Sequence, residues 1–221
     1  MTDSQARDEI CRVGKSLFER GYVHATAGNI SVRLEDGGYL ITPTEACLGF
    51  LDPARLARID PQGRHAGGDQ PSKTLALHVR IVAEAGKHDP ATRCVLHTHS
   101  THCVALSLAD RQDELLAPVT PYFVMKVGHV PHLGYQRPGA AETVAEVAQV
   151  IQRYGAAGTP IRAVMLNRIG PVVWHESPAA AMAVLEELEE TARLTARAGP
   201  ALQALDAGSI EELRAAFGAR W

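Results

Sequence analysis

The segment between Val95 and His102 constrains the fold more than any other part of the chain. An apolar run passes into His-Thr-His, which predicts a short buried strand over residues 93–99. Successive side chains of a strand alternate between its two faces, so His97 and His99 are expected on the same face. Two imidazoles placed in this way are typical of a divalent-metal site, whereas the alternative is a pair of packed or surface histidines. His102 follows in the first turn of a predicted helix.

Helix and strand patterns alternate along the rest of the chain without an intervening linker. Apolar residues at helical spacing predict helices over about 10–20, 71–88, 140–154 and 178–198, with a short final helix over 209–221. Strands are predicted over 29–34, 39–42, 163–166 and 171–174, and the first two form a hairpin. With 221 residues, 46% of them hydrophobic, the chain can bury a core of its own, so we predict a single domain over residues 1–221.

Charge, hydropathy and cysteine spacing argue against several classes of protein. A formal net charge of -3 without a basic run gives no indication of a nucleic-acid surface. The longest apolar stretches are too short to cross a membrane, and the amino-terminal residues lack a signal-peptide pattern. The four cysteines are scattered and form no CxxC pair. These features indicate a reduced, cytoplasmic enzyme that binds neither nucleic acid nor membrane.

Four short motifs follow one another along the chain: TAGNISVR at 26–33, ITPT at 41–44, GDQPSK at 68–73 and HTH at 97–99. In this order they resemble the class II aldolase/adducin-head family, whose typical member is fuculose-1-phosphate aldolase. The resemblance implies an α/β fold with three layers, in which a largely antiparallel central sheet is flanked by helices. It also implies a cyclic homotetramer with active sites at subunit interfaces. Segments 69–73, 122–128 and 186–192 are most similar to the 3-oxo-tetronate 4-phosphate decarboxylase branch.

The resemblance further implies a phosphate pocket formed by Asn29, Thr44, Ser72 and Lys73. Their chemistry suits that role, because an amide, two hydroxyls and an ammonium group donate hydrogen bonds, and Ser72 is expected where a helix begins. The alternative is an ordinary capped helix with two turns. Glu45 stands where the family usually has glycine. A carboxylate there repels phosphate if it faces the pocket, so either Glu45 points away or the anion differs.

The family binds its metal through three histidines, and the resemblance places two of them at His97 and His99. The third normally lies in the turn between the last two strands, where this chain has Ile169. Isoleucine cannot coordinate a metal, so the remaining ligand is sought among the other histidines or water. The candidates are His102, His132 and His175, and relatives carry His102 in a structural position. Zinc is the favoured ion, with manganese or cobalt as alternatives.

Two further positions bear on the chemistry. The aldolases carry a glutamate two residues after the serine matched by Ser72, where this chain has Thr74. Aldol cleavage needs a base to remove a hydroxyl proton, whereas decarboxylation of a β-keto acid needs an electron sink at the ketone. Tyr122 matches a family tyrosine that reaches the site of a neighbouring subunit, where either this tyrosine or a water molecule could deliver the proton that the enediolate needs. An equally acceptable interpretation is a core aromatic with its hydroxyl at the surface.

The sequence therefore predicts a metal-dependent carbon–carbon lyase acting on a small phosphorylated 3-oxo sugar acid, with decarboxylation preferred. The catalytic positions are Thr74 and Tyr122, the phosphate ligands are those named above, and His97 and His99 hold the metal. One alternative is an aldolase or epimerase that uses another base. The other is a non-catalytic binding or scaffold protein, since the chain lacks both the family glutamate and the third histidine.

Overall fold

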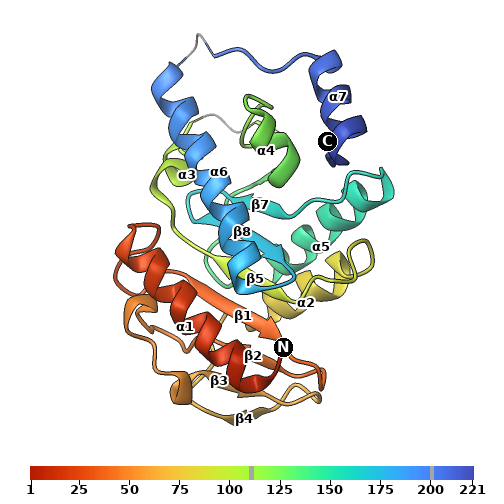
Figure 1. Cartoon of the computed structure of the whole chain (residues 1–221). Coiled ribbons are helices and arrows are strands. Elements are labelled where there is room, and N and C mark those ends of the chain that lie inside the picture. Colours follow the sequence, from red (N-terminus) through yellow and green to blue (C-terminus); the bar gives the residue numbers. More distant parts are fainter. Residues whose placement is uncertain (110–111, 200–201) are drawn as a thin grey trace.

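A computed structural model of the chain describes residues 1–109, 112–199 and 202–221 (Figure 1). Its α-helices are α1 (Asp3–Glu19), α2 (Leu75–Ala85), α3 (Thr101–Leu106), α4 (Pro121–Lys126), α5 (Ala141–Ala156), α6 (Pro178–Ala198) and α7 (Ala207–Phe217). Its strands are β1 (Asn29–Arg33), β2 (Tyr39–Ile41), β3 (Ala57–Ile59), β4 (His65–Gly67), β5 (Cys94–His97), β6 (His132–Leu133), β7 (Ala163–Leu166) and β8 (Gly170–His175). Two short 3-10 helices, η1 (Leu48–Phe50) and η2 (Pro53–Arg55), lie between β2 and β3.

The eight described strands form one sheet in the order β4-β3-β2-β1-β5-β8-β7-β6. Every neighbouring pair is antiparallel except β6 with β7. The predicted hairpin is confirmed, because β1 pairs with β2, and β7 likewise pairs with β8. The predicted strand over 93–99 is β5, which lies between β1 and β8 and ends at His97. Asn29 is the direct cross-strand partner of His97, so the sheet brings two of the sequence motifs together.

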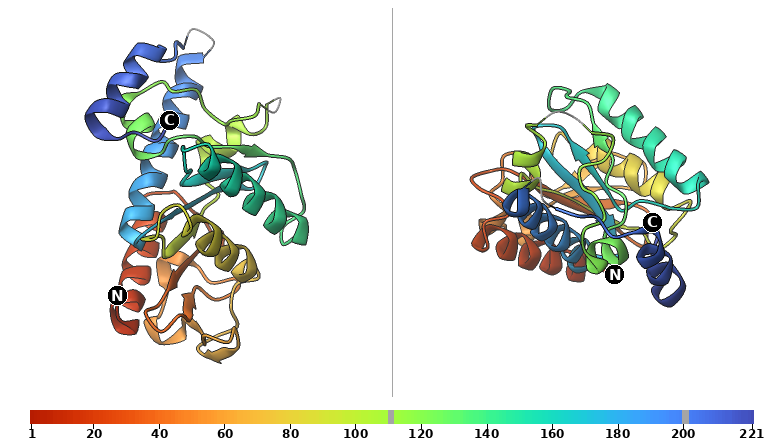
Figure 2. Two further views of the ribbon diagram at one scale, coloured as in Figure 1. Left: turned by 90° about the vertical axis from the view of Figure 1, so that its right-hand side faces the viewer. Right: turned by 90° about the horizontal axis from the view of Figure 1, so that it is seen from above.

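Helices cover both faces of this sheet (Figure 2). Helices α1 and α6 pack against each other and against β1, β5 and β8, whereas α2 and α5 pack together on the opposite face. Successive side chains of β5 point to opposite faces of the sheet, so Leu96 packs in the core beneath α1 and α6 and Val95 packs in the core beneath α2 and α5. His97 is two residues beyond Val95 and therefore faces the α2/α5 layer. The predicted three-layer α/β architecture with a largely antiparallel sheet is confirmed.

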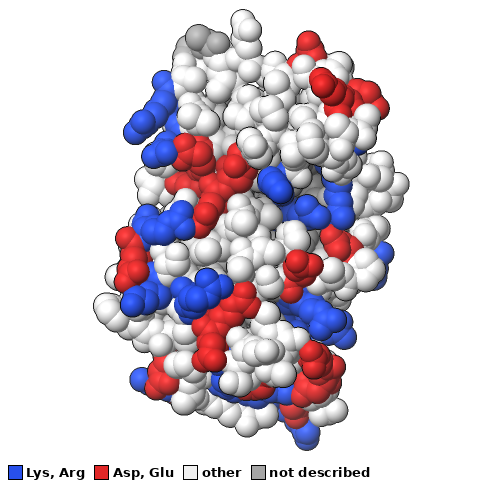
Figure 3. All heavy atoms as spheres, in the orientation of Figure 1, with Lys and Arg blue, Asp and Glu red and all other residues white. Residues whose placement is uncertain are grey.

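The two helices of the first layer begin at strong capping signals. Thr2 caps α1, accepting a hydrogen bond from the Gln5 N–H group while the Gln5 side chain accepts one from the Thr2 N–H group. Ser177 caps α6 in front of Pro178, and this helix spans the predicted 178–198. Side chains of both signs are interspersed on the face seen in Figure 3. Arg20 of the segment after α1 forms an ion pair with Glu186 of α6. Among the described helices, none is sufficiently long and apolar to cross a bilayer.

The start of α2 differs from the prediction. The helix was expected from 71–72 but begins at Leu75, so Ser72 is neither its cap nor part of its first turn. The physical reason is a competing backbone interaction: Pro71 forms a bridge with Pro43, and the Ser72 N–H group donates to the Thr42 carbonyl oxygen at 3.2 Å. This extended pairing holds residues 70–72 beside the loop that follows β2, which places the third motif next to the second.

Candidate active site

A cavity of about 580 Å³ opens where β1 and β5 meet the amino-terminal turns of α2 and α5. Its wall includes Asn29, Ser72, Lys73, His97 and His99, which come from three of the four motifs. The approach of the β1 loop to β5 needs a glycine, which is supplied by residue 28. A Cβ atom on Gly28 would lie 2.8 Å from the His97 carbonyl oxygen, and its φ of +87° is strained for other residues.

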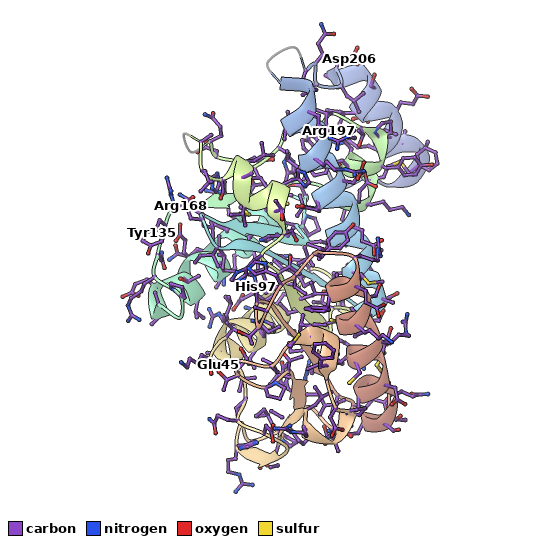
Figure 4. All side chains as sticks on the ribbon, turned by 90° about the vertical axis from the view of Figure 1, so that its left-hand side faces the viewer. Glu45, His97, Tyr135, Arg168, Arg197 and Asp206 are labelled. Carbon is purple, nitrogen blue, oxygen red and sulfur yellow. The ribbon has the colours of Figure 1, made fainter. Side chains whose placement is uncertain are left out.

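His97, which is labelled in Figure 4, and His99 both line this cavity. Their ring centroids are 5.1 Å apart. His97 is only 6% exposed, and its Nδ1–H group donates to the Pro171 carbonyl oxygen at 2.9 Å, which leaves Nε2 with its lone pair. Burial lowers the pKa of His97 to about 4, helped by the nearby His99. Burial also lowers the pKa of His99, with a further contribution from His24. Both imidazoles are therefore neutral at physiological pH, and each has a nitrogen lone pair that can coordinate a metal ion.

None of the three histidines considered as a substitute third ligand lines the cavity. The His102 Nδ1–H group donates to the Glu189 carboxylate at 2.9 Å, on the far side of the sheet. His132 lies on β6 and His175 at the end of β8. Ile169 does line the cavity, as its match to the third family ligand implies. Among the described residues, no group of three or more histidine, cysteine, aspartate or glutamate side chains is arranged to hold a metal ion.

Thr74 lines the cavity, and its side chain takes part in a hydrogen-bond network within the cavity wall. Its hydroxyl group donates to the Asn29 Oδ1 atom at 3.0 Å, and an amide oxygen can only accept. The Thr74 oxygen therefore accepts from the Ser72 hydroxyl at 3.0 Å and from His78 Nε2 at 3.5 Å. Because the Asn29 oxygen faces Thr74, the Asn29 NH₂ group is directed away from Thr74. It is therefore available to donate a hydrogen bond to an anion in the cavity. Thr74 positions Asn29, and its hydroxyl proton is already engaged.

His78 is the buried end of the same network. It stands one helical turn after Thr74 in α2 and lines the cavity, and its Nδ1 atom accepts from the Ser31 hydroxyl at 2.8 Å. Burial lowers the pKa of His78 to about 3, with a smaller contribution from His97. No motif in the sequence pointed to this histidine. Its spacing of four residues from Thr74 was the one signal that both side chains share a helix face.

His78 predicts a loss of stability in mild acid. The unfolded chain protonates this histidine near pH 6.5, but the folded chain does so only near pH 3, so stability is complete above about pH 6.5 and falls as the pH drops. Between pH 7 and pH 5, we expect His78 to account for about 2 kcal/mol of the decrease in the free energy of unfolding. Urea unfolding of the wild type and His78→Gln at both pH values measures this difference. Equal decreases for both proteins would show that His78 is not the cause.

The remaining predicted phosphate ligands differ in position. Lys73 is exposed at the cavity wall, whereas Thr44 lines a neighbouring hollow of about 270 Å³. Glu45 lines both spaces, and its backbone lies in the left-handed region at a φ of +57°. Glu45 therefore forms part of the wall of the candidate cavity. The resulting site combines donors for an anion with a carboxylate at the rim.

Tyr122 lies away from these residues within the chain. It is 63% exposed on α4 and lines a separate surface cavity with residues of α6, among them Glu186 and Glu190. Any contribution of Tyr122 to the candidate site must therefore come from another copy of the chain. Arg137, in contrast, lines the candidate site, although no motif in the sequence pointed to it.

The three-layer fold with its largely antiparallel sheet, and a cavity lined by two neighbouring histidines, define a protein of the class II aldolase type. The chain belongs to the class II aldolase and adducin family, because the family model described as "Class II Aldolase and Adducin N-terminal domain" matches residues 8–196.

Individual relatives agree with this assignment. The 3-oxo-tetronate 4-phosphate decarboxylase of Cupriavidus necator is 49% identical over 100% of this chain and 99% of its own length. The solved structure of YgbL from Klebsiella pneumoniae superimposes with a TM-score of 0.86 at 40% identity, covering 97% of this chain and 100% of that one. A solved L-fuculose 1-phosphate aldolase shares the fold, with a TM-score of 0.79 at 20% identity over 97% of each chain.

Proposed function

We propose that this protein is a carbon–carbon lyase that decarboxylates a small phosphorylated 3-oxo acid of the 3-oxo-tetronate 4-phosphate type. The observation that carries the proposal is the pairing of Asn29 with His97 across β1 and β5, which brings a side-chain amide and a pair of imidazoles into one cavity. The identity of 49% with a named 3-oxo-tetronate 4-phosphate decarboxylase over the full chain supports the substrate class.

The donor set of the cavity fits a divalent metal ion held by two protein ligands. Two neutral imidazoles with ring centroids 5.1 Å apart can share one ion, and the fixed Nδ1–H group of His97 aims its Nε2 lone pair at the cavity. His97 and His99 would hold this ion, for which zinc is our first choice and manganese or cobalt the alternatives. When bound, the ion would supply a Lewis acid for the ketone oxygen and leave positions for substrate and water.

The side chains of the protein would perform the other tasks. Asn29, Ser72 and Lys73 would bind the phosphate group, with Thr74 fixing the orientation of the Asn29 amide. Loss of carbon dioxide leaves an enediolate on the substrate, and this must be protonated at carbon. Thr74 cannot act as a carboxylate base, and its hydroxyl proton is engaged by Asn29. The lack of a carboxylate base at position 74 disfavours aldol cleavage, which needs a base, more than decarboxylation, in which the substrate carboxylate is already ionised.

We propose that the proton donor is Tyr122 of a neighbouring copy in a homotetramer, or a water molecule. The exposure of Tyr122 on α4, outside the cavity of its own chain, supports this assignment. The catalytic unit would be the single domain 1–221, acting in the cytoplasm on a free small molecule. Light scattering gives the oligomeric state, and mixing inactive Tyr122→Phe with inactive His97→Ala chains tests the shared site. Recovery of activity in the mixture supports it, whereas a monomer of full activity contradicts it.

Assays with two classes of substrate, each tested separately, distinguish the proposed reaction from its alternatives. Metal-loaded protein is expected to release carbon dioxide from 3-oxo-tetronate 4-phosphate and to leave a ketose 1-phosphate uncleaved. Cleavage of the ketose phosphate to dihydroxyacetone phosphate, without decarboxylation, would favour the aldolase. Failure with both substrates, in protein that retains no metal after reconstitution, would favour the binding or scaffold alternative.

Glu45 should weaken phosphate binding in the natural sequence. Replacing it with glycine removes a like charge from the rim and a backbone strain of about 1–2 kcal/mol, which the flexibility of glycine offsets by about 0.5–1 kcal/mol. We therefore expect Glu45→Gly to bind inorganic phosphate about 3- to 10-fold more tightly, with a small change in stability. Calorimetric titration with phosphate measures this, and Glu45→Gln separates charge from backbone. Unchanged affinity in both variants would place the anion elsewhere.

A further inference from the structure

We propose that Arg137 binds the carboxylate of the substrate and makes the site specific for phosphorylated acids over neutral sugar phosphates. The inference rests on the proposed function and deepens it. It assigns a second anion subsite in the same cavity, in addition to that of Asn29, Ser72 and Lys73. The observations that carry it are the position of Arg137 in the cavity wall, the rigid attachment of its loop and the lack of a competing carboxylate partner.

The loop that carries Arg137 follows β6 and is tied to α5. The Thr143 hydroxyl donates to the Gln136 Oε1 atom at 2.6 Å, and the Gln136 Nε2 atom donates to the Glu146 carboxylate at 2.6 Å. The residue immediately before Arg137 thus forms hydrogen bonds to α5 through both the oxygen and the nitrogen of its side-chain amide. The Arg137 carbonyl oxygen also accepts from the Ala140 N–H group at 3.1 Å. The backbone beside the cavity is therefore positioned before a ligand arrives.

The guanidinium group itself has no partner within the described residues, and it is exposed at the cavity. Most arginines elsewhere on the surface do form ion pairs, for example Arg20, Arg55 and Arg64. Glu45 is the one acidic side chain in the described cavity wall, and it forms no ion pair with Arg137. In Figure 4, Glu45 and Tyr135, two residues before Arg137, are seen on opposite sides of His97. An anion in the cavity is thus the ligand available to Arg137.

The chemistry of the proposed substrate matches this arrangement. A phosphorylated 3-oxo acid has an anion at each end. Lys73 offers one cation from the turn before α2, and Arg137 offers another from the loop before α5. Arginine presents two parallel N–H groups that match a carboxylate. The first turn of α5 also lines the cavity, and its N-cap Ala140 supplies no side-chain bond to the free N–H groups there.

The proposed contact has a kinetic signature. The carboxylate loses its charge as carbon dioxide departs, so Arg137 holds the substrate at least as strongly as the transition state. Replacing Arg137 should therefore raise KM about 10- to 100-fold and change kcat much less. A residue that only supported the fold would lower both stability and kcat.

Binding of two inert ligands tests the inference without turnover. 3-Phosphoglycerate carries phosphate and carboxylate, whereas glycerol 3-phosphate carries phosphate alone. In metal-loaded protein, we expect Arg137→Gln to lose about 10- to 100-fold in affinity for 3-phosphoglycerate and to keep its affinity for glycerol 3-phosphate. Arg168→Gln is the matched control, because it removes an exposed cation near the cavity that does not line it (Figure 4). This control should keep both affinities, and Lys73→Gln should weaken both ligands together.

Two outcomes would overturn the inference. In the first, Arg137→Gln binds both ligands with the affinity of the wild type. In the second, Arg137→Gln loses affinity for both ligands equally, although thermal unfolding shows that its fold is intact. Arg137→Lys retains the positive charge but lacks the two parallel N–H groups of arginine. Partial recovery of the affinity for 3-phosphoglycerate in this variant supports the proposed contact with the carboxylate. The proposed function fails separately, through absence of carbon dioxide release, and that result leaves the measured preference for 3-phosphoglycerate in place.

Discussion

Replacing Ile169 with histidine is expected to raise the affinity of the protein for zinc by at least about 100-fold, since the loss of even an outer partner of a metal ligand costs about 10- to 100-fold. Ile169 lines the cavity that contains His97 and His99. It is held there by the turn into β8, in which a Cβ atom on Gly170 would lie 2.0 Å from the Thr98 carbonyl oxygen. A third imidazole at this position would complete a three-histidine site of the kind common for zinc.

Calorimetric titration of metal-free protein with zinc measures this gain. Ile169→Leu is the matched control, because it keeps an apolar side chain of the same size and should leave the affinity unchanged. His102→Ala should also leave it unchanged, since the ring is bound to Glu189 outside the cavity. If Ile169→His binds zinc no more tightly than the wild type, then residue 169 does not face the ion, and the two-imidazole account of the metal site is wrong.

Replacing His97 with alanine is expected to lower kcat/KM by at least about 10³-fold, because one of only two protein ligands is removed and electrostatic stabilisation of developing charge is the largest catalytic term. The substitution also frees the Pro171 carbonyl oxygen, to which His97 donates at 2.9 Å, and this costs about 1–3 kcal/mol of stability. The assay must therefore include a measurement of folding. His97→Asn, which keeps a donor group, should be more stable and almost equally inactive.

His24 provides the matched control for His97. Its ring lies 6.3 Å from that of His99 between centroids, yet its side chain is exposed and outside the cavity wall. We expect His24→Ala to keep activity within about 3-fold, because its exposed side chain does not line the cavity and a surface substitution usually has a small effect. Equal loss of activity in His24→Ala and His97→Ala would mean that the histidine cluster acts in another way.

The sequence predicted those elements whose signals are local and strong. α6 begins at Ser177-Pro178, and β5 and β8 are apolar runs bounded by polar residues, so their positions agree closely with the prediction. Strands β3, β4 and β6 were missed because each has two or three residues, too few to show a period. The start of α2 was misplaced, since only the long-range bond from Ser72 to Thr42 shows that residues 71–72 are extended.

The candidate site was foreseen only in part, for a similar reason. Two imidazoles on one strand face are visible in sequence, but the pairing of Asn29 with His97 is a matter of strand register. Arg137 stands in a loop without a recognisable pattern, and its place in the cavity depends on how α5 packs on α2. The engagement of Thr74 with Asn29 likewise depends on tertiary contacts and could not be inferred from the residue at that position alone.

Carbon dioxide release is the most direct test of the central claim, which is decarboxylation at a two-imidazole metal site. Purified protein is loaded with zinc, mixed with 3-oxo-tetronate 4-phosphate and assayed for carbon dioxide and dihydroxyacetone phosphate, before and after removal of the metal by a chelator. The account predicts equal amounts of both products, loss of both on chelation and recovery on adding zinc back. Metal-loaded, folded protein that releases no carbon dioxide, or release that is unaffected by complete removal of metal, would contradict it.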